Sequence, residues 1–118
     1  MPVWQKAHQL ALEVFRLSAP LPRAEDYGLK SQIRRSANSV PGNIAEAFGR
    51  NTPKDKAGFY IIARGSSFET QNHLLYGEKV GYFQESLTTP LIKEYDHLIH
   101  ELNKILKTLA QGKSQTKT

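Results

Sequence analysis

Apolar residues recur at intervals of three and four along most of this 118-residue chain. The spacing is clearest near the start, where Val3, Ala7, Leu10, Val14 and Leu17 follow one another in a 4-3-4-3 pattern. An α-helix turns once every 3.6 residues, so this pattern places the five side chains on one helical face. No segment alternates apolar and polar residues convincingly, and no Asn-Gly or Asp-Gly turn marks a hairpin. The pattern therefore predicts an all-α fold.

Proline and glycine divide the pattern into four predicted helices. We expect these helices at about residues 2–18, 27–49, 53–79 and 89–110. Short connections favour antiparallel neighbours, so we expect one antiparallel four-helix bundle over residues 1–110. Residues 111–118, QGKSQTKT, are polar and are predicted to be a disordered tail.

Two Thr-Pro pairs are predicted to begin the third and fourth helices. Thr52 is a good N-cap, Pro53 suits the first helical position, and Asp55 complements the positive end of the helix. Thr89 and Pro90 repeat the start of this pattern. The fourth helix is therefore expected to begin at Thr89-Pro90. Its predicted core face consists of Leu91, Tyr95, Leu98, Leu102, Ile105 and Leu109.

Pro41 and Gly42 stand in the middle of the second predicted helix. Pro41 lacks an N–H and its ring crowds the carbonyl of Ala37, which predicts a kink that costs about 3 kcal/mol in an uncompensated helix. One reason for such a bend is packing, since it lets the helix wrap around the core. The other is function, since it exposes a carbonyl or a shallow pocket for binding. We expect packing to be the reason.

The third predicted helix is apolar on two sides. One seam consists of Ala57, Ile61, Phe68 and Leu75, and the other of Phe59, Ile62, Ser66, His73 and Val80, with Tyr60, Leu74 and Tyr76 outside both. One bundle core needs only one stripe, so this helix is either the most buried element or one that also faces a neighbouring subunit. We expect a homo-oligomer, with Phe59 and Ile62 as interface or structural residues.

Positive charge is concentrated in residues 29–64. This segment holds seven Lys or Arg and two Asp or Glu, an excess equal to the net charge of +5 of the whole chain. The basic residues are Lys30, Arg34, Arg35, Arg50, Lys54, Lys56 and Arg64. Such an excess predicts a surface that binds the phosphates of RNA or DNA. The alternative is a solvated face that keeps the protein soluble.

Asn43, Glu46 and Arg50 share one polar stripe beyond the proline. Glu46 and Arg50 are in the favourable i to i+4 order for an ion pair, which contributes only a few tenths of a kcal/mol when it is exposed. If the three residues are buried between subunits, they fix register and orientation instead. We assign Pro41, Asn43 and Glu46 interface or structural roles.

Three stretches, VWQKAHQLALEVFRLS, YGLKSQIRRSANSVPGNIAEAFGR and TPKDKAGFYIIARGSSFE, resemble the bacterial four-helix-bundle family of 23S rRNA-intervening-sequence proteins. The family's hallmark has the form G-L-x-x-Q-[IL]-R-R-[AS]-x-x-S-[IV]-x-x-N-[IL]-A-E-[GA]-x-G-R, and residues 28–50 fill it. Ala47 stands where glycine is usual. The resemblance extends over about residues 2–85.

The resemblance implies a fold and an assembly more than an activity. Members of the family form four-helix bundles that assemble as ring-like homopentamers. The family is also similar to the accessory protein of diversity-generating retroelements, which associates with a reverse transcriptase and its RNA. The resemblance therefore implies a pentamer and a nucleic-acid or reverse-transcriptase partner.

Nothing in the sequence predicts an enzyme. No serine stands in a nucleophile elbow, and no glycine-rich phosphate loop is present. His97 and His100 lie beside Asp96 and Glu101, but the sequence does not place one Glu-x-x-His motif on each of two facing helices, as di-metal bundles do, so we expect no metal and no cofactor. The absence of cysteine fits a reducing cytoplasm, and we expect neither a secretion signal nor a membrane span.

Two functions follow from these observations. The first is a non-catalytic, basic, oligomeric protein that holds RNA or DNA through the seven basic residues, without reading bases. The second is a scaffold that docks an enzyme such as a reverse transcriptase without touching nucleic acid. The two differ in salt dependence, because only phosphate binding weakens steeply as ionic strength rises.

Overall fold

Four long α-helices and one short 3-10 helix make up the fold. A computed structural model describes residues 2–112, so the predicted disorder of residues 113–118 lies outside the described part. The elements are α1 (Pro2–Ser18), η1 (Arg23–Glu25), α2 (Leu29–Phe48), α3 (Pro53–Lys79) and α4 (Glu85–Ala110). No strand occurs in residues 2–112. The prediction of an all-α fold is confirmed.

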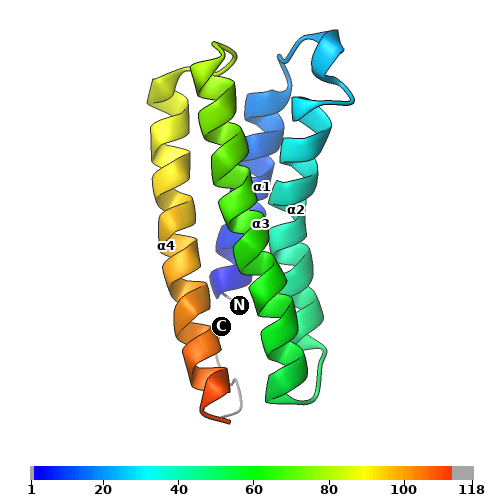
Figure 1. The fold of residues 1–118 in the computed structure, drawn as a ribbon, viewed down its shortest axis with the longest axis vertical. Helices are drawn as coiled ribbons and strands as arrows, with labels where there is room; N and C mark the ends of the chain where they lie inside the picture. The colour runs from blue at the N-terminus through cyan, green and yellow to red at the C-terminus, as the bar shows by residue number, and fades with distance from the viewer. Residues whose placement is uncertain (1, 113–118) are drawn as a thin grey trace.

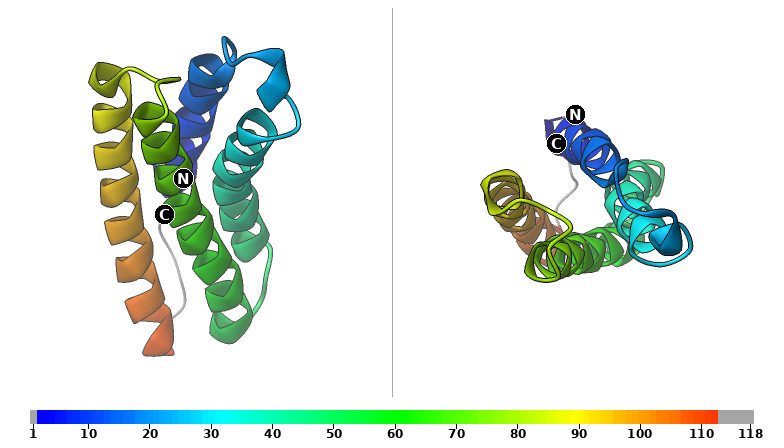
Figure 2. Two further views of the ribbon diagram at one scale, coloured as in Figure 1. Left: turned by 45° about the horizontal axis from the view of Figure 1, so that its top comes forward. Right: turned by 90° about the horizontal axis from the view of Figure 1, so that it is seen from above.

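The four long helices run alternately up and down, as Figure 1 shows. Seen from above, they occupy the corners of a square in chain order, and α4 closes the square beside α1 (Figure 2). Each helix packs against the helices that precede and follow it in the sequence. The molecule is therefore an antiparallel four-helix bundle, as the apolar spacing predicts.

The predicted core faces of α1 and α4 are confirmed. In α1 the buried apolar residues are Val3, Ala7, Leu10 and Val14, with Leu17 partly buried. In α4 they are Leu91, Tyr95, Leu98, Ile99, Leu102 and Leu109, with Ile105 partly buried. In both helices the residues that recur every three or four positions form the side that faces the bundle interior.

The core face of α3 differs from the prediction. The buried residues are Tyr60, Ala63, Ser67, Thr70, Leu74 and Gly77, a stripe that runs between the two predicted seams. It includes Tyr60 and Leu74, which the sequence analysis placed outside both. The small and hydroxyl-bearing members of this stripe bring α3 close to α2, where the Thr70 and Ser36 hydroxyl oxygens lie 2.8 Å apart in the core. The more apolar residues of α3 lie on its flanks.

Two helix starts also differ from the prediction. α2 begins at Leu29 instead of Tyr27, because the carboxylate of Glu25 accepts a hydrogen bond from the Leu29 N–H and so caps the helix there. α4 begins at Glu85, and Pro90 lies inside it. Pro90 removes only one backbone hydrogen bond near the end of a 26-residue helix, which packing of the remaining turns outweighs.

The starts of α1 and α3 are as predicted. The Thr52 hydroxyl accepts a hydrogen bond of 3.1 Å from the Asp55 N–H, and Pro53 occupies the first turn. α2 continues as one helix from Leu29 to Phe48 with Pro41 buried inside it. The proline therefore does not divide the helix, and its burial agrees with the packing explanation.

The α3–α4 connection closes one end of the bundle. The backbone N–H groups of Tyr82 and Phe83 donate to the Gly77 carbonyl at 2.8 and 3.1 Å. This turn brings the Phe83 ring so close to Gly77 that a Cβ at position 77 would lie 2.3 Å from Phe83 Cε2. The Tyr82 hydroxyl also donates to Glu25 at 2.9 Å, which joins this turn to the α1–α2 connection.

Candidate interaction surfaces

Two of the predicted phosphate-binding residues, Arg34 and Lys30, bind carbonyl groups at the carboxyl end of α1. Arg34 donates to the Ser18 hydroxyl at 2.8 Å and to the Phe15 carbonyl at 3.0 Å, and its guanidinium lies 3.8 Å from the centre of the Phe15 ring. Lys30 reaches the Ala19 carbonyl at 3.5 Å and pairs with Asp26 at 3.7 Å. Both cations therefore stabilise the end of a helix where carbonyl groups lack partners.

Lys56 likewise binds carbonyl groups at the carboxyl end of α2. Its ammonium donates to the Ala47 carbonyl at 3.1 Å and reaches the Phe48 carbonyl at 3.5 Å. In an antiparallel bundle each helix starts beside the end of the one before it. A cation in the first turns of α2 or α3 is therefore well placed to cap the preceding helix, which accounts for part of the positive excess in residues 29–64.

The remaining four basic residues make contacts of different kinds. Arg50 pairs with Glu46 at 3.4 Å, and its guanidinium lies 4.7 Å from the Phe59 ring centre. Arg64 donates to the Asn103 side-chain carbonyl of α4 at 2.9 Å. Arg35 and Lys54 are exposed and make no hydrogen bond or ion pair with another residue in the range 2–112. Phosphate binding by the seven residues therefore stays a prediction.

The structural residues proposed at the proline-containing part of α2 are also separated. Asn43 donates to the carbonyl and the hydroxyl of Ser39 at 2.8 and 2.9 Å, and Ser39 in turn accepts a 2.9 Å bond from Ser66 of α3. Asn43 therefore belongs to the contact between α2 and α3, whereas Glu46 forms only an exposed pair with Arg50. The stripe does not act as one trio within the chain.

The outward side of α3 is unusually apolar. We call Ile62, Phe68, Leu75, Tyr76 and Val80 the outer α3 surface. Their side chains are 46–56% exposed, and the sequence analysis had assigned Tyr76 to neither apolar seam. Gly58 and Gly65, one heptad apart, lie between its two flanks, and a Cβ at either position would meet no atom within 4 Å. The seven-residue spacing of these glycines was visible in the sequence but was not recognised.

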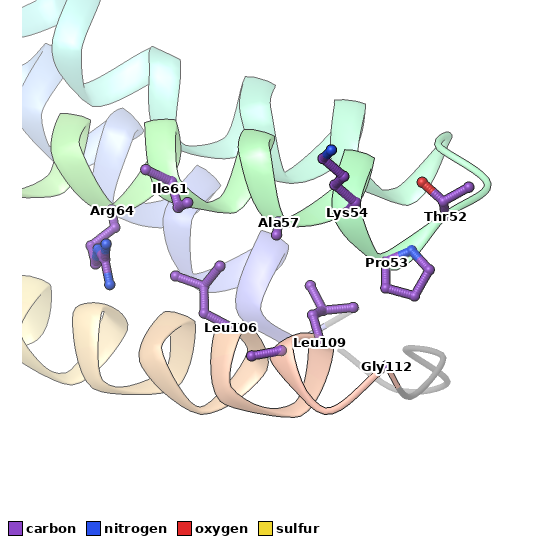
Figure 3. A pocket seen from close by; sticks show the side chains of 10 residues that line it. Thr52, Pro53, Lys54, Ala57, Ile61, Arg64, Leu106, Leu109 and Gly112 are labelled. Atoms are coloured by element: carbon purple, nitrogen blue, oxygen red, sulfur yellow. The ribbon is translucent and has the colours of Figure 1, made fainter.

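A groove lies beside this surface, between the first turns of α3 and the last turns of α4 (Figure 3). It encloses about 640 Å³. Ala57, Ile61, Leu106 and Leu109 supply its apolar lining. Arg64 extends from α3 toward α4 at one end of the groove, and Lys54 stands on the α3 side nearer the other end, with its ammonium group directed away from α4 in this view. This site was not predicted from the sequence, because its residues come from two different helices.

The titratable residues of the described range make mostly local contacts. No group of three or more His, Cys, Asp or Glu in residues 2–112 is placed to hold a metal ion. His73 lies 3.2 Å from the Glu69 carboxylate. Lys6 of α1 pairs with Glu94 of α4 and lowers the pKa of that carboxyl group. Burial raises the pKa of Tyr95. These contacts join neighbouring turns or neighbouring helices of the bundle.

Membrane insertion has no support from the helices of the described range, because none of them is long and apolar enough to cross a bilayer.

Comparison with known proteins places the fold in a defined group. The solved structure of a protein of unknown function from the S23 ribosomal protein family of Bacteroides thetaiotaomicron VPI-5482 is similar, with a TM-score of 0.83 and 22% sequence identity. The match covers 90% of this chain and 99% of that chain, and at this identity it shows the fold alone. No curated protein matches. The family model of the 23S rRNA-intervening sequence protein matches residues 1–104, and the chain therefore belongs to that family.

Proposed function

We propose that this protein is a non-catalytic interaction module that assembles with copies of itself through the outer α3 surface. A ring of five subunits is the assembly expected from the resemblance described above. The module would then dock a partner, such as a reverse transcriptase, in the reducing setting of the cytoplasm. The observation that carries the proposal is the distribution of apolar residues on α3, whose buried stripe is rich in small and hydroxyl residues while five large apolar residues are exposed on its outward side, beside Glu69, Asn72 and Lys79.

The energy of covering the outer α3 surface supports this proposal. Fully burying a large apolar side chain contributes about 1.5–3 kcal/mol, so covering five side chains that are half exposed contributes roughly 4–7 kcal/mol per copy. A monomer gains nothing from leaving these side chains in water. Exposed apolar patches of this kind are typical of protein–protein contacts.

Gly58 and Gly65 add a second argument. Glycine inside a helix costs about 1 kcal/mol relative to alanine. Neither residue has a positive φ, and neither has a neighbour within 4 Å that would clash with a Cβ. The fold of one chain therefore gives no reason for these glycines. Close approach of a helix from another copy of the chain gives a reason for them.

A pair of matched variants tests self-assembly through this surface. Phe68 on α3 and Leu87 on α4 are almost equally exposed, at 53% and 52%. Phe68→Glu is expected to lower the mass of the assembly measured by sedimentation, because it places a charge in the contact. Leu87→Glu adds the same charge elsewhere and is expected to leave the mass unchanged. An unchanged mass in Phe68→Glu, or the same loss in both variants, would refute this role of α3.

Nucleic-acid binding is a second candidate. Arg35 and Lys54 are exposed and their charges are unpaired among residues 2–112. An assembly of several copies, each with a net charge of +5, would concentrate positive charge on one particle. A titration with a structured RNA at two salt concentrations tests this function. Binding that falls steeply with salt and is lost in Arg35→Glu would support it. No binding at low salt would leave the interaction module as the sole candidate.

A further inference from the structure

The groove between α3 and α4 combines an apolar lining with charge of one sign. Leu109 is buried, Leu106 and Ala57 are partly buried, and Ile61 is half exposed, so the surface available to a ligand is hydrocarbon. Among residues 2–112, the only charged residues that line the groove are Lys54 and Arg64, and no carboxylate of this range lines it.

The two lining cations are not neutralised within the described chain. Arg64 donates to Asn103, an uncharged amide, so the positive charge of the guanidinium remains. Lys54 is exposed and has no hydrogen-bond or ion-pair partner among residues 2–112. Cations beside apolar walls produce a stronger potential than the same cations in open water. The groove therefore favours a ligand that is apolar in the middle and negative at its ends.

From this complementarity, we propose that the groove binds an acidic amphipathic helix of a partner protein. Lys54 and Arg64 are ten residues apart in α3, which corresponds to about 15 Å along the helix axis. A helix with apolar residues at i, i+3, i+4 and i+7 would lay them on Ala57, Ile61, Leu106 and Leu109, as helices do in other grooves. Its carboxylates, about ten residues apart, would meet the two cations. This partner deepens the proposed interaction module but does not depend on self-assembly.

Other occupants match the groove less well. Single-stranded RNA binds proteins by stacking bases on aromatic rings, and no aromatic residue in the described part of the chain lines the groove. The six residues after Gly112 include Lys113 and Lys117 and no acidic residue, so their charge has the wrong sign. A second copy of the chain is the remaining alternative, and the experiment below separates it from a partner helix.

The test uses two synthetic helical peptides of about 15 residues, which span the distance between the cations. Both carry leucine at the four apolar positions. One has glutamate at the outer positions and the other has lysine there. We expect fluorescence anisotropy to show that the full-length protein binds the acidic peptide at least about tenfold more tightly, because charge complementarity decides between the two. Equal affinities, or no binding of the acidic peptide, would overturn the proposal.

Charge-reversal variants test whether the acidic peptide binds in the groove. The double variant Lys54→Glu/Arg64→Glu is expected to lose at least about tenfold in affinity for the acidic peptide. Arg35→Glu/Lys79→Glu makes the same change in net charge away from the groove and is expected to lose less than about threefold, since long-range charge effects are screened by salt. Ile61→Ser is expected to weaken binding by removing apolar contact. An equal loss in both double variants would overturn the proposal.

Light scattering on the same variants separates this proposal from self-assembly. If Lys54→Glu/Arg64→Glu changes the number of subunits, the groove is a contact between copies and the partner-helix proposal fails. If the wild-type chain is a monomer but binds the acidic peptide, and charge reversal at Lys54 and Arg64 weakens this binding as expected, the self-assembly proposal fails while the groove proposal stands.

Discussion

Arg34 contacts both the aromatic ring and the backbone carbonyl of Phe15. Its guanidinium lies over the Phe15 ring at 3.8 Å, and one of its terminal nitrogens donates to the Phe15 carbonyl at 3.0 Å. A third contact, from Nε to the Ser18 hydroxyl, fixes the side chain between α1 and α2. Only a planar group with several donors can make this combination of contacts. Arg34 therefore joins two helices, whereas the next residue, Arg35, points to solvent.

The Arg34 contacts predict unequal effects of the same substitution at neighbouring positions. Arg34→Lys is expected to lower the free energy of unfolding by about 1–2 kcal/mol, through lost hydrogen bonds and a weaker cation–π contact. Arg35→Lys is expected to change it by less than about 0.5 kcal/mol. Urea denaturation of both variants at one protein concentration measures the difference. Equal effects would mean that Arg34 is not a structural residue.

Two glycines of α3 predict opposite outcomes for substitution by alanine. Gly77→Ala is expected to destabilise the fold by about 1–3 kcal/mol, because the new methyl group overlaps the buried Phe83 ring. Gly65→Ala has open space around it within one chain and is expected to favour the helix by up to about 1 kcal/mol.

The Gly65→Ala variant also reports on the contact between copies. If a neighbouring helix approaches α3 closely at Gly65, the added methyl group is expected to lower the mass of the assembly while the isolated fold becomes no less stable. Thermal melting and light scattering on Gly65→Ala and Gly77→Ala measure the two effects separately. A stable Gly77→Ala protein would contradict the packing described for Phe83.

Because Tyr95 is buried, the folded protein is expected to become less stable in alkaline solution. Burial raises the pKa of Tyr95 above its usual value of 10.0, so the unfolded chain loses this proton at a lower pH than the folded chain does. The contribution of Tyr95 to stability is therefore complete below pH 10 and falls as the pH rises toward the raised pKa. Between pH 9 and 11 the loss amounts to about 1.4 kcal/mol.

Comparison of the wild type with Tyr95→Phe isolates this loss. Phenylalanine cannot ionise, so the variant is expected to gain about 1.4 kcal/mol relative to the wild type between pH 9 and 11. Urea denaturation at several pH values gives the difference directly, and other alkaline effects cancel because both proteins share them. A difference that stays constant with pH would show that Tyr95 ionises as readily in the folded protein as in the unfolded chain.

The exposed pair of Glu46 and Arg50 predicts a small effect within one chain. Glu46→Ala is expected to lower the free energy of unfolding by no more than about 0.5 kcal/mol, since exposed i to i+4 pairs contribute little. The mass of the assembly measured for the same variant tests the interface role predicted from the sequence. An unchanged mass and an unchanged melting temperature would remove Glu46 from the interface.

The sequence predicted the parts of the fold in which apolar residues face the core. The seams of α1 and α4 are of this kind. It misplaced the core of α3 because Ser67 and Thr70 read as polar, although their hydroxyls donate to the backbone carbonyls of Ala63 and Ser66 and can therefore be buried. Ile61 and Phe68 belong to one of the two predicted apolar seams of α3, and the fold leaves both half exposed.

The candidate sites were harder to predict than the fold. The roles of Lys30, Arg34 and Lys56 depend on carbonyl groups at the end of another helix, which a pattern within one helix does not reveal. The groove depends on α3 and α4 meeting side by side. What the sequence did indicate correctly is that α3 has more apolar surface than one core requires.

The mass of the wild-type protein in solution, measured by light scattering over a range of concentrations, tests the central claim most directly. Self-assembly through the outer α3 surface predicts a mass that is a multiple of the 13.3 kDa chain, with five copies expected. A mass of 13.3 kDa at every concentration would contradict the account and leave the apolar side of α3 to a different partner.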